Sequence, residues 1–357
     1  MPARVRLLMR PDTELCVFVP GLLGPVRGVP ASMLEPPDLT AMPLWWSRGS
    51  HRPDQQDDDG SPETTLLDDL GMARRGELPG AALSLLGENG SLPAAATVLR
   101  ADPVHAWAGT SDLHHDPGAV QPVTAAEIHR LCGDFNEVFA SDGWTLHAPA
   151  SSTLYLCARH ALSVRTTPLS KTIGTALSAC MPGGEDGARL RALINEVQMW
   201  LFEHPLNQAR EQRGEAVING LWPWGAGEPA AATRSPVAVW AHDPFWRGVG
   251  RHAGAVADAL PDHPGHVLDE ALAPGQTIVV LDQVWTSVCR GDVEAWQAAL
   301  AEVDREWLQS AYKAIRQGRL DAVVLWSPPA GAFRLDRRGL RRFWRRLRSP
   351  GARLVDG

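Results

Sequence analysis

Short apolar runs bounded by turn-forming residues recur along this chain and predict the strands of a buried sheet. The clearest are Leu15–Val19, Gln276–Asp282 and Leu320–Trp326, and two further runs are Leu154–Ala158 and Pro236–Ala241. Runs in which apolar residues follow one another without alternation are typical of strands that are covered on both faces.

Between these runs, apolar residues recur with the 3.6-residue period of helices. Thr124 and Glu127 have the spacing of a capping box and predict the start of one helix. Asp186–Phe202 and Asp292–Gln317 each carry one apolar stripe and predict two amphipathic helices. Because strands and helices alternate, we expect an α/β protein with a central mixed or parallel sheet flanked by helices, folded as a single domain over residues 1–357.

The composition is that of a globular protein with a sizeable core. Hydrophobic residues make up 44% of the 357 positions, and a net charge of -7 is too mild to name a partner. The five cysteines form no CxxC pair, which favours free thiols over a zinc site or a disulfide framework. No apolar run is long enough to span a membrane, and the first residues lack the apolar core of a secretion signal. We therefore expect a cytoplasmic protein.

Two segments differ from this general pattern. Residues 47–63 are polar and acidic without periodicity, and predict a disordered or solvated insertion. Residues 336–348 predict an Arg-rich C-terminal helix with apolar residues on the opposite face. Such a helix either docks through its apolar stripe or uses its arginines to contact nucleic acid or a membrane surface. The negative net charge and the lack of a recognisable helix-turn-helix favour docking, so no specific nucleic-acid partner is expected.

Residues 195–227 contain the densest group of hydrogen-bonding, aromatic and turn-forming residues. His204, Asn207 and Arg210 follow a helix break at His204-Pro205, so all three can border one cleft at the start of a new helix. The free N–H groups at a helix N-terminus suit a phosphate or carboxylate, and an arginine adds charge-assisted contacts.

The same stretch ends in a loop with one asparagine, aromatic residues and glycines that permit close backbone approach. Its candidate ligand-binding residues are Asn219, Trp222, Gly225 and Gly227. A structural role is equally compatible with these residue types. In that alternative, Asn219 satisfies buried backbone groups and Arg210 pairs with a carboxylate on another helix.

Asp102 and His105 are two further candidate ligand-binding residues. They lie in an extended segment that Pro103 interrupts, and proline inside a strand indicates an edge or a bulge. Side chains at such an irregularity can face a cleft. A turn-forming aspartate and a surface histidine are the alternative.

The segment HPLNQAREQRGEAVINGLWPWGAG resembles a motif of archaeal-type cofactor-independent phosphoglycerate mutases. The matching residues are His204, Pro205, Asn207, Arg210, Gly214, Asn219, Trp222, Gly225 and Gly227. The chain also resembles a bacterial family labelled regulatory protein RpfE or phosphoglycerate-mutase-like, which shares the helix NEVQMWL and the element from Leu99 to His105. These resemblances imply a reduced alkaline-phosphatase-like fold.

The mutases use two divalent metals and a Ser or Thr nucleophile, and this chain departs from them at the metal positions. Pro20-Gly21 stands where the mutases have Asp-Gly, and Asp282-Gln283 stands where a later strand ends in Asp-His. We therefore expect a protein without a cofactor that is regulatory or binds a small anion; its partner is a small phosphorylated or carboxylate ligand, or another protein. The alternative is an active metal-dependent mutase or phosphate-ester hydrolase whose metal ligands come from Asp102, His105, His204, Asp282 or His242-Asp243.

Overall fold

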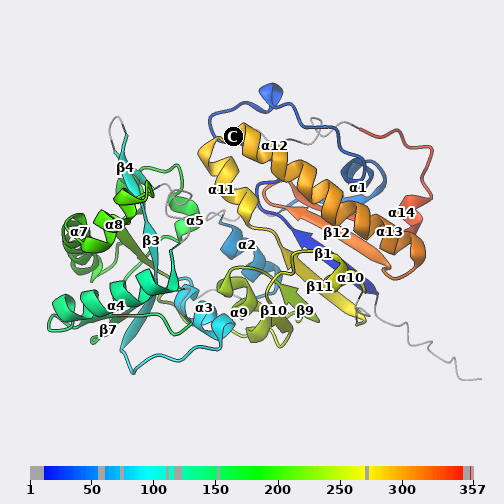
Figure 1. Ribbon diagram of the computed structural model, residues 1–357. Coiled ribbons are helices and arrows are strands. Elements are labelled where there is room, and N and C mark those ends of the chain that lie inside the picture. Colours follow the sequence, from blue (N-terminus) through cyan, green and yellow to red (C-terminus); the bar gives the residue numbers. More distant parts are fainter. Residues whose placement is uncertain are drawn as a thin grey trace, which may run out of the picture.

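The computed structural model describes residues 12–54, 61–72, 76–109, 112–115, 123–150, 153–269, 273–348 and 354. Its larger sheet consists of β1 (Thr13–Phe18), β2 (Ser50–Arg52), β9 (Ala238–Trp240), β10 (Val256–Asp258), β11 (Gly275–Val280), β12 (Ala322–Ser327) and β13 (Gly331–Asp336). The spatial order is β10-β9-β11-β1-β12-β13-β2 (Figure 1). The strands from β10 to β12 are parallel, whereas β13 and β2 are antiparallel to their neighbours. The predicted α/β class with a mixed central sheet is confirmed.

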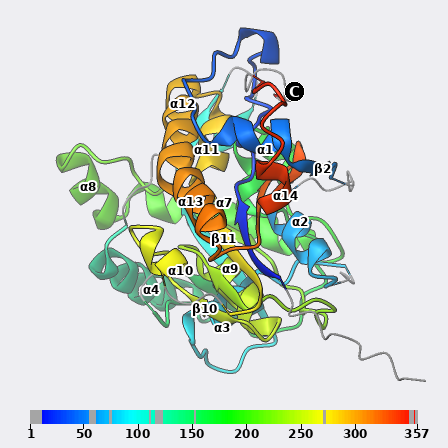
Figure 2. The same cartoon turned by 90° about the vertical axis from the view of Figure 1, so that its right-hand side faces the viewer.

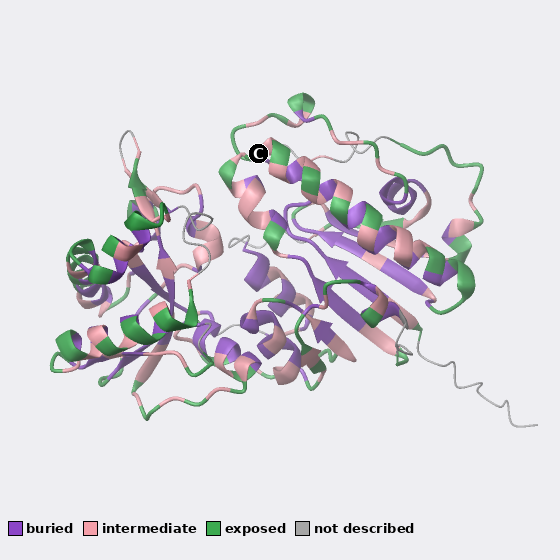
Figure 3. Ribbon diagram, viewed as in Figure 1, coloured by how far each residue is buried: buried purple, intermediate pink, exposed green. Residues whose placement is uncertain are grey.

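β1 shows why an uninterrupted apolar run forms a central strand. Leu15 and Val17 point into one hydrophobic cluster, and Cys16 and Phe18 point into another on the opposite face of the sheet. Because successive side chains of a strand alternate between faces, a strand covered on both sides needs apolar residues at every position. Figure 3 shows the strands of this sheet as largely buried.

Helices cover both faces of the larger sheet. On one face lie α1 (Met42–Arg48), α10 (Gly265–Asp269), α11 (Gln283–Arg290), α12 (Val293–Glu302) and α13 (Gln309–Gln317). On the other lie α2 (Pro62–Asp69), α3 (Gly80–Glu88) and α9 (Pro244–His252). The helix predicted over 292–317 is present as one helical run, in which a π-helical stretch, Val303–Leu308, separates α12 from α13.

A second, antiparallel sheet lies beside the first, at the left in Figure 1. It consists of β3 (Thr97–Val104), β6 (Trp144–His147), β7 (Tyr155–Ala158) and β8 (Gly220–Trp224) in the order β6-β7-β3-β8. Its cluster of buried residues includes side chains of α4 (Ala125–Phe139), α7 (Gly187–Phe202) and α8 (Pro205–Gln212). Trp222 and Trp224 of β8 pack instead with the cluster under the larger sheet, so the two sheets share buried contacts. That they form a single domain stays a prediction.

The remaining short elements are η1 (Ala31–Met33), β4 (Ala106–Ala108), β5 (Leu113–His115), α5 (Leu169–Thr172), α6 (Leu177–Cys180) and α14 (Arg337–Leu340). β4 and β5 form a two-stranded ribbon at the upper tip of the second sheet (Figure 1). Within the described part of the chain, no helix combines the length and the apolar character that crossing a membrane requires.

Two segment predictions need correction. The insertion expected over 47–63 is partly structured. Residues 50–52 form β2 at the sheet edge, and Ser61–Glu63 are buried at the start of α2. Residues 55–60 lie outside the described residues. The helix expected over 336–348 is only α14, and residues 341–348 follow it as turns and extended chain in front of α1 (Figure 2). Of the predicted apolar stripe, Leu340 packs against the core, whereas Phe343, Trp344 and Leu347 are exposed.

Candidate functional site

A cavity of about 610 Å³ lies between the two sheets, where α2 and α9 meet β3. The ends of β9 and β11 supply His242, Asp243 and Asp282, and α2 supplies Glu63. In parallel α/β sheets the carboxyl ends of the strands are the usual place for a ligand, because the loops that follow them converge there. We call this space the Asp282 cavity. The other side chains used below are Arg100, Asp102, Trp224, Trp246 and Trp285, all of which line it.

One arginine organises the wall that β3 contributes. The Arg100 guanidinium donates two hydrogen bonds to Asp243, of 2.7 and 2.8 Å, and its Nε donates a third, of 2.9 Å, to Asp102. Asp102 also accepts a 2.6 Å hydrogen bond from the indole N–H of Trp224. Burial raises the pKa of Asp243, but the attraction of Arg100 outweighs burial and holds that pKa below its ordinary value. The arginine charge is therefore already matched by two carboxylates.

Two other carboxyl groups at the cavity have raised pKa values. Burial raises the pKa of Glu63 to about 7, although Ser170 donates a 2.7 Å hydrogen bond to it. Burial and the nearby negative charge of Asp243 raise the pKa of Asp282 to about 6, and the Trp246 indole donates a 2.7 Å hydrogen bond to its Oδ2. Carboxyl groups with pKa values near neutrality, gathered at a cavity, are typical of functional sites.

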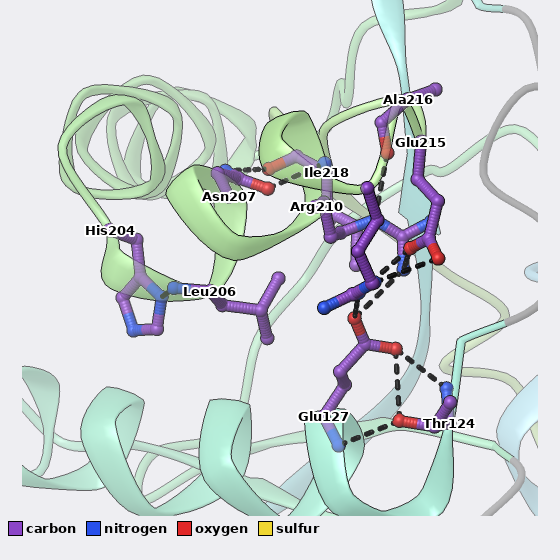
Figure 4. Close-up of polar contacts among 10 residues, drawn as sticks. Thr124, Glu127, His204, Leu206, Asn207, Arg210, Glu215, Ala216 and Ile218 are labelled. Atoms are coloured by element: carbon purple, nitrogen blue, oxygen red, sulfur yellow. Dashed lines mark hydrogen bonds and ion pairs between the residues drawn. The ribbon is translucent and has the colours of Figure 1, made fainter.

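The predicted ligand-binding residues of α8 lie elsewhere, in the second sheet's core (Figure 4). His204 caps α8, since its Nδ1 accepts the N–H of Leu206 at 3.2 Å, and its Nε2 lies 3.1 Å from Asp134. The Asn207 amide donates to the carbonyls of Leu201 and Ile218 and accepts the N–H of Ile218, all within 2.8 Å. The N-terminus of α8, which suggested an anion site, is thus capped by the His204 side chain.

Arg210 has the partner that the structural alternative named. Its side chain is fully buried, its Nε donates a 2.7 Å hydrogen bond to the carbonyl of Ala216, and its Nη1 lies 3.1 Å from Glu127. Glu127 is itself the last residue of the capping box that begins with Thr124, and this box is confirmed (Figure 4). The ion pair therefore joins α8 to the N-terminus of α4.

The remaining candidates also make contacts within the protein. Asn219 pairs with the backbone of Ala106, accepting its N–H and donating to its carbonyl at 2.6 Å each. His105 Nδ1 lies 2.9 Å from the carbonyl of Val217, and the Trp222 indole donates to the carbonyl of Thr167. The Asn219 and His105 contacts join the end of β3 to the start of β8, and the Trp222 contact ties β8 to the loop that contains Thr167.

Gly225 and Gly227 lie where the chain passes close to α3. At Gly225, φ is +78° and an added Cβ would lie 2.5 Å from Cα of Gly80. At Gly227, an added Cβ would lie 2.0 Å from the carbonyl oxygen of Glu77. Close approach explains both glycines without a ligand. Of the nine predicted ligand-binding residues, Asp102 alone lines the Asp282 cavity, and a ligand-binding role for the others stays a prediction.

Glu63 and Arg100 line the cavity but were not predicted as site residues. Glu63 directly follows Ser61-Pro62, a helix-start signal, but it is the last residue of the segment 47–63 that was predicted to be disordered or solvated. Arg100 lies on β3, two residues before Asp102, so both side chains are on the same face of the strand. This two-residue spacing is the sequence pattern from which Arg100 could have been predicted as a neighbour of Asp102 at the site.

The donors in the cavity do not fit the two-metal site that the mutase resemblance implies. Asp102, His242, Asp243 and Asp282 do share the cavity, but Arg100 engages two of these carboxylates and Trp246 a third. His105 lies just after the end of β3, and His204 caps α8 in the second sheet's half of the structure, so neither lines the cavity. Within the described ranges, no three His, Cys, Asp or Glu side chains are arranged to hold a metal ion. The absence of a cofactor stays a prediction.

Comparisons with known proteins give only distant similarities. No protein-family model and no curated protein matches the chain. Among solved structures, the chain is similar to the cofactor-independent phosphoglycerate mutase from Thermoplasma acidophilum DSM 1728, with 14% identity, a TM-score of 0.41, and coverage of 90% of this chain and 88% of that one. It is also similar to the PH0037 protein from Pyrococcus horikoshii, with 13% identity, a TM-score of 0.47, and coverage of 88% and 81%. Values this low assign neither a family nor an activity.

Proposed function

We propose that this protein binds a small polar molecule in the Asp282 cavity, in a regulatory role and without metal-dependent phosphoryl transfer. The observation that supports this proposal is the meeting of Glu63, Asp282 and the Arg100–Asp243 pair at one cavity at the carboxyl ends of β9 and β11. These groups come from distant parts of the chain, and burying several carboxyl groups together is unfavourable unless something compensates.

The lining favours a ligand that donates hydrogen bonds. Two carboxylates match the charge of Arg100, and Glu63 and Asp282 add acceptors. Hydroxyl and ammonium groups satisfy such acceptors, and an ammonium is also attracted to the faces of Trp rings such as those of Trp246 and Trp285. The ligand class supported best is therefore a small molecule with hydroxyl and amino groups.

The phosphorylated or carboxylate ligand expected from the mutase resemblance needs a rearrangement. An anion in the cavity would have to take the place of Asp243 on Arg100, or meet Glu63 and Asp282 in their protonated forms. Arginine binds phosphate in the same two-bonded geometry that it has here with Asp243, so such an exchange is chemically reasonable. Acid pH would favour it.

Isothermal titration calorimetry with three probes tests the proposal on the full-length protein. The probes are glucosamine, which carries hydroxyl and ammonium groups, glucose, which carries hydroxyls only, and 3-phosphoglycerate. We expect glucosamine to bind more tightly than glucose, and more tightly at pH 7 than at pH 5, because the ionised fraction of both carboxyl groups rises over this range while the glucosamine ammonium keeps its charge. Asp282→Asn is expected to weaken glucosamine binding by about tenfold, as loss of one charged hydrogen bond does.

Asp321→Asn is the matched control, because Asp321 precedes β12 and so lies at the amino-terminal edge of the same sheet. It should leave glucosamine binding unchanged. Absence of glucosamine binding, or equal binding to wild type and Asp282→Asn, would overturn the proposed ligand class. Stoichiometric manganese or zinc in the purified protein together with robust phosphoglycerate mutase turnover would overturn the non-catalytic role.

A further inference from the structure

The short helix α14 and the segment that follows it, residues 337–348, combine positive charge with exposed apolar side chains. Residues 337–348 contain seven arginines and no acidic residue, in a chain whose net charge is -7. Phe343, Trp344 and Leu347 are 78%, 69% and 53% exposed. Large apolar side chains that are exposed together and rimmed by polar residues mark interaction sites with proteins or membranes. We call the exposed members the Arg–Trp patch: Arg337, Arg338, Arg341, Phe343, Trp344, Arg345, Arg346, Leu347 and Arg348.

The backbone of this segment is held in place, so the exposure is not that of a loose chain end. The Trp46 indole donates a 3.0 Å hydrogen bond to the carbonyl of Arg348, whose own N–H donates one of 2.9 Å to Ser47. The Arg342 guanidinium donates to the carbonyl of Arg48 at 3.1 Å. These contacts attach the segment to α1 and leave its apolar side chains in solvent. In Figure 2 it lies on the surface in front of α1.

A cavity of about 490 Å³ opens beside the patch. Arg345, Arg346 and Arg348 line it together with His51 and the aromatic residues Trp46 and Phe333. Three guanidinium groups around one cavity form a binding place for a phosphate, because each offers a fork of N–H donors. The cavity can receive the phosphate of a headgroup while the neighbouring apolar side chains enter the acyl boundary.

We propose that the Arg–Trp patch docks this protein on the surface of a membrane that contains anionic lipids. Arginines around exposed Trp, Phe and Leu are the combination by which peripheral proteins bind such surfaces, through attraction to headgroups and burial of apolar side chains. Single-stranded nucleic acid would also be attracted to the arginines. It could stack on Phe343 and Trp344, which pack edge to face with ring centroids 5.5 Å apart and keep open faces, but the exposed Leu347 beside them favours the acyl boundary of a membrane. Leu347 offers nothing to a base.

Co-sedimentation of the full-length protein with lipid vesicles tests this proposal. We expect binding to vesicles of phosphatidylcholine mixed with phosphatidylglycerol, little binding to phosphatidylcholine alone, and weakening by added salt. Arg341→Glu combined with Arg346→Glu should weaken binding by at least about 25-fold, since each basic residue near an anionic surface contributes roughly a fivefold gain. Trp344→Ala combined with Leu347→Ala should weaken it while leaving the salt dependence in place.

Two matched controls separate the patch from general stickiness. Met199 and Phe202 are also strongly exposed, at 75% and 84%, but they lie on α7 at the other end of the molecule in Figure 1. Met199→Ala with Phe202→Ala should leave vesicle binding unchanged, as should Arg305→Glu on the exposed surface of the π-helical stretch. Failure of the wild-type protein to bind anionic vesicles would refute the proposal. Binding of the patch variants that is as tight as that of wild type would also refute it. Tighter binding to a single-stranded oligonucleotide than to vesicles would replace the membrane with nucleic acid.

Discussion

Arg210 is the residue at which a structural role and a ligand-binding role predict different results. In Arg210→Met, the apolar part of the side chain is retained, and the ion pair with Glu127 and the hydrogen bond to the carbonyl of Ala216 are lost. Removing one partner of a buried ion pair costs about 3–5 kcal/mol, much of it from the partner that is left behind. The structural role therefore predicts a large loss of stability.

The structure places the expected loss at the lower end of that range, at about 3 kcal/mol. Glu127 is not left alone, because Arg213 lies 2.8 Å from it and Thr124 donates to it. Among the described residues, Arg210 Nη2 also has no hydrogen-bond partner, and the substitution removes that unfavourable burial. The unpaired carbonyl of Ala216 remains the main cost.

Urea unfolding of wild type and variant, followed by both tryptophan fluorescence and circular dichroism, measures this difference. Arg213→Ala is the control, because Arg213 contacts the same Glu127 but is exposed, and its removal should change the midpoint little or not at all. A variant Arg210→Met that is as stable as wild type, yet has lost ligand binding, would refute the structural role and restore the ligand-binding one.

Two further predictions concern Glu63 and the glycine loop. Burial raises the pKa of Glu63 to about 7 in the folded protein, from its ordinary value of 4.5, so the folded state holds the proton more tightly. Stability therefore falls as pH rises between these two values, by about 3 kcal/mol from this group. Unfolding measured at several pH values should show that Glu63→Gln loses this part of the decrease; an unchanged pH profile would contradict it. Gly225→Ala should destabilise the protein by about 2 kcal/mol or more, because φ is positive and Gly80 is too close, whereas Gly214→Ala, with positive φ but open space, should cost about 1 kcal/mol. Equal losses in thermal unfolding would contradict the close-approach explanation.

Some features of this protein were determined by local sequence alone. The run Leu15–Val19 requires burial on both faces and became the central strand β1, and Thr124 with Glu127 formed the expected capping box. These features depend on residues a few positions apart, so their physical cause is contained in the segment itself. The same holds for His204-Pro205, which ends α7 and begins α8.

Other features depend on contacts that no local pattern encodes. Whether Arg210 binds a ligand or a carboxylate was decided by Glu127, which lies 83 positions earlier on another helix. The helical period of residues 336–348 predicted a docked helix, but a period favours helix only where a partner covers the apolar stripe, and Phe343 and Trp344 have remained in solvent.

The Asp282 cavity shows this division most clearly. The sequence supplied Asp282 at the end of an apolar strand and Asp102 beside a proline, each a candidate by its neighbours alone. Only the packing of α2 and β3 against the ends of β9 and β11 brought Glu63 and Arg100 to the same cavity. Burial then raised the pKa values of two carboxyl groups, and burial is a property of the surrounding protein, not of the residue. Residue types and local structure thus follow from the sequence, whereas the chemistry of the site follows from which distant groups exclude water together.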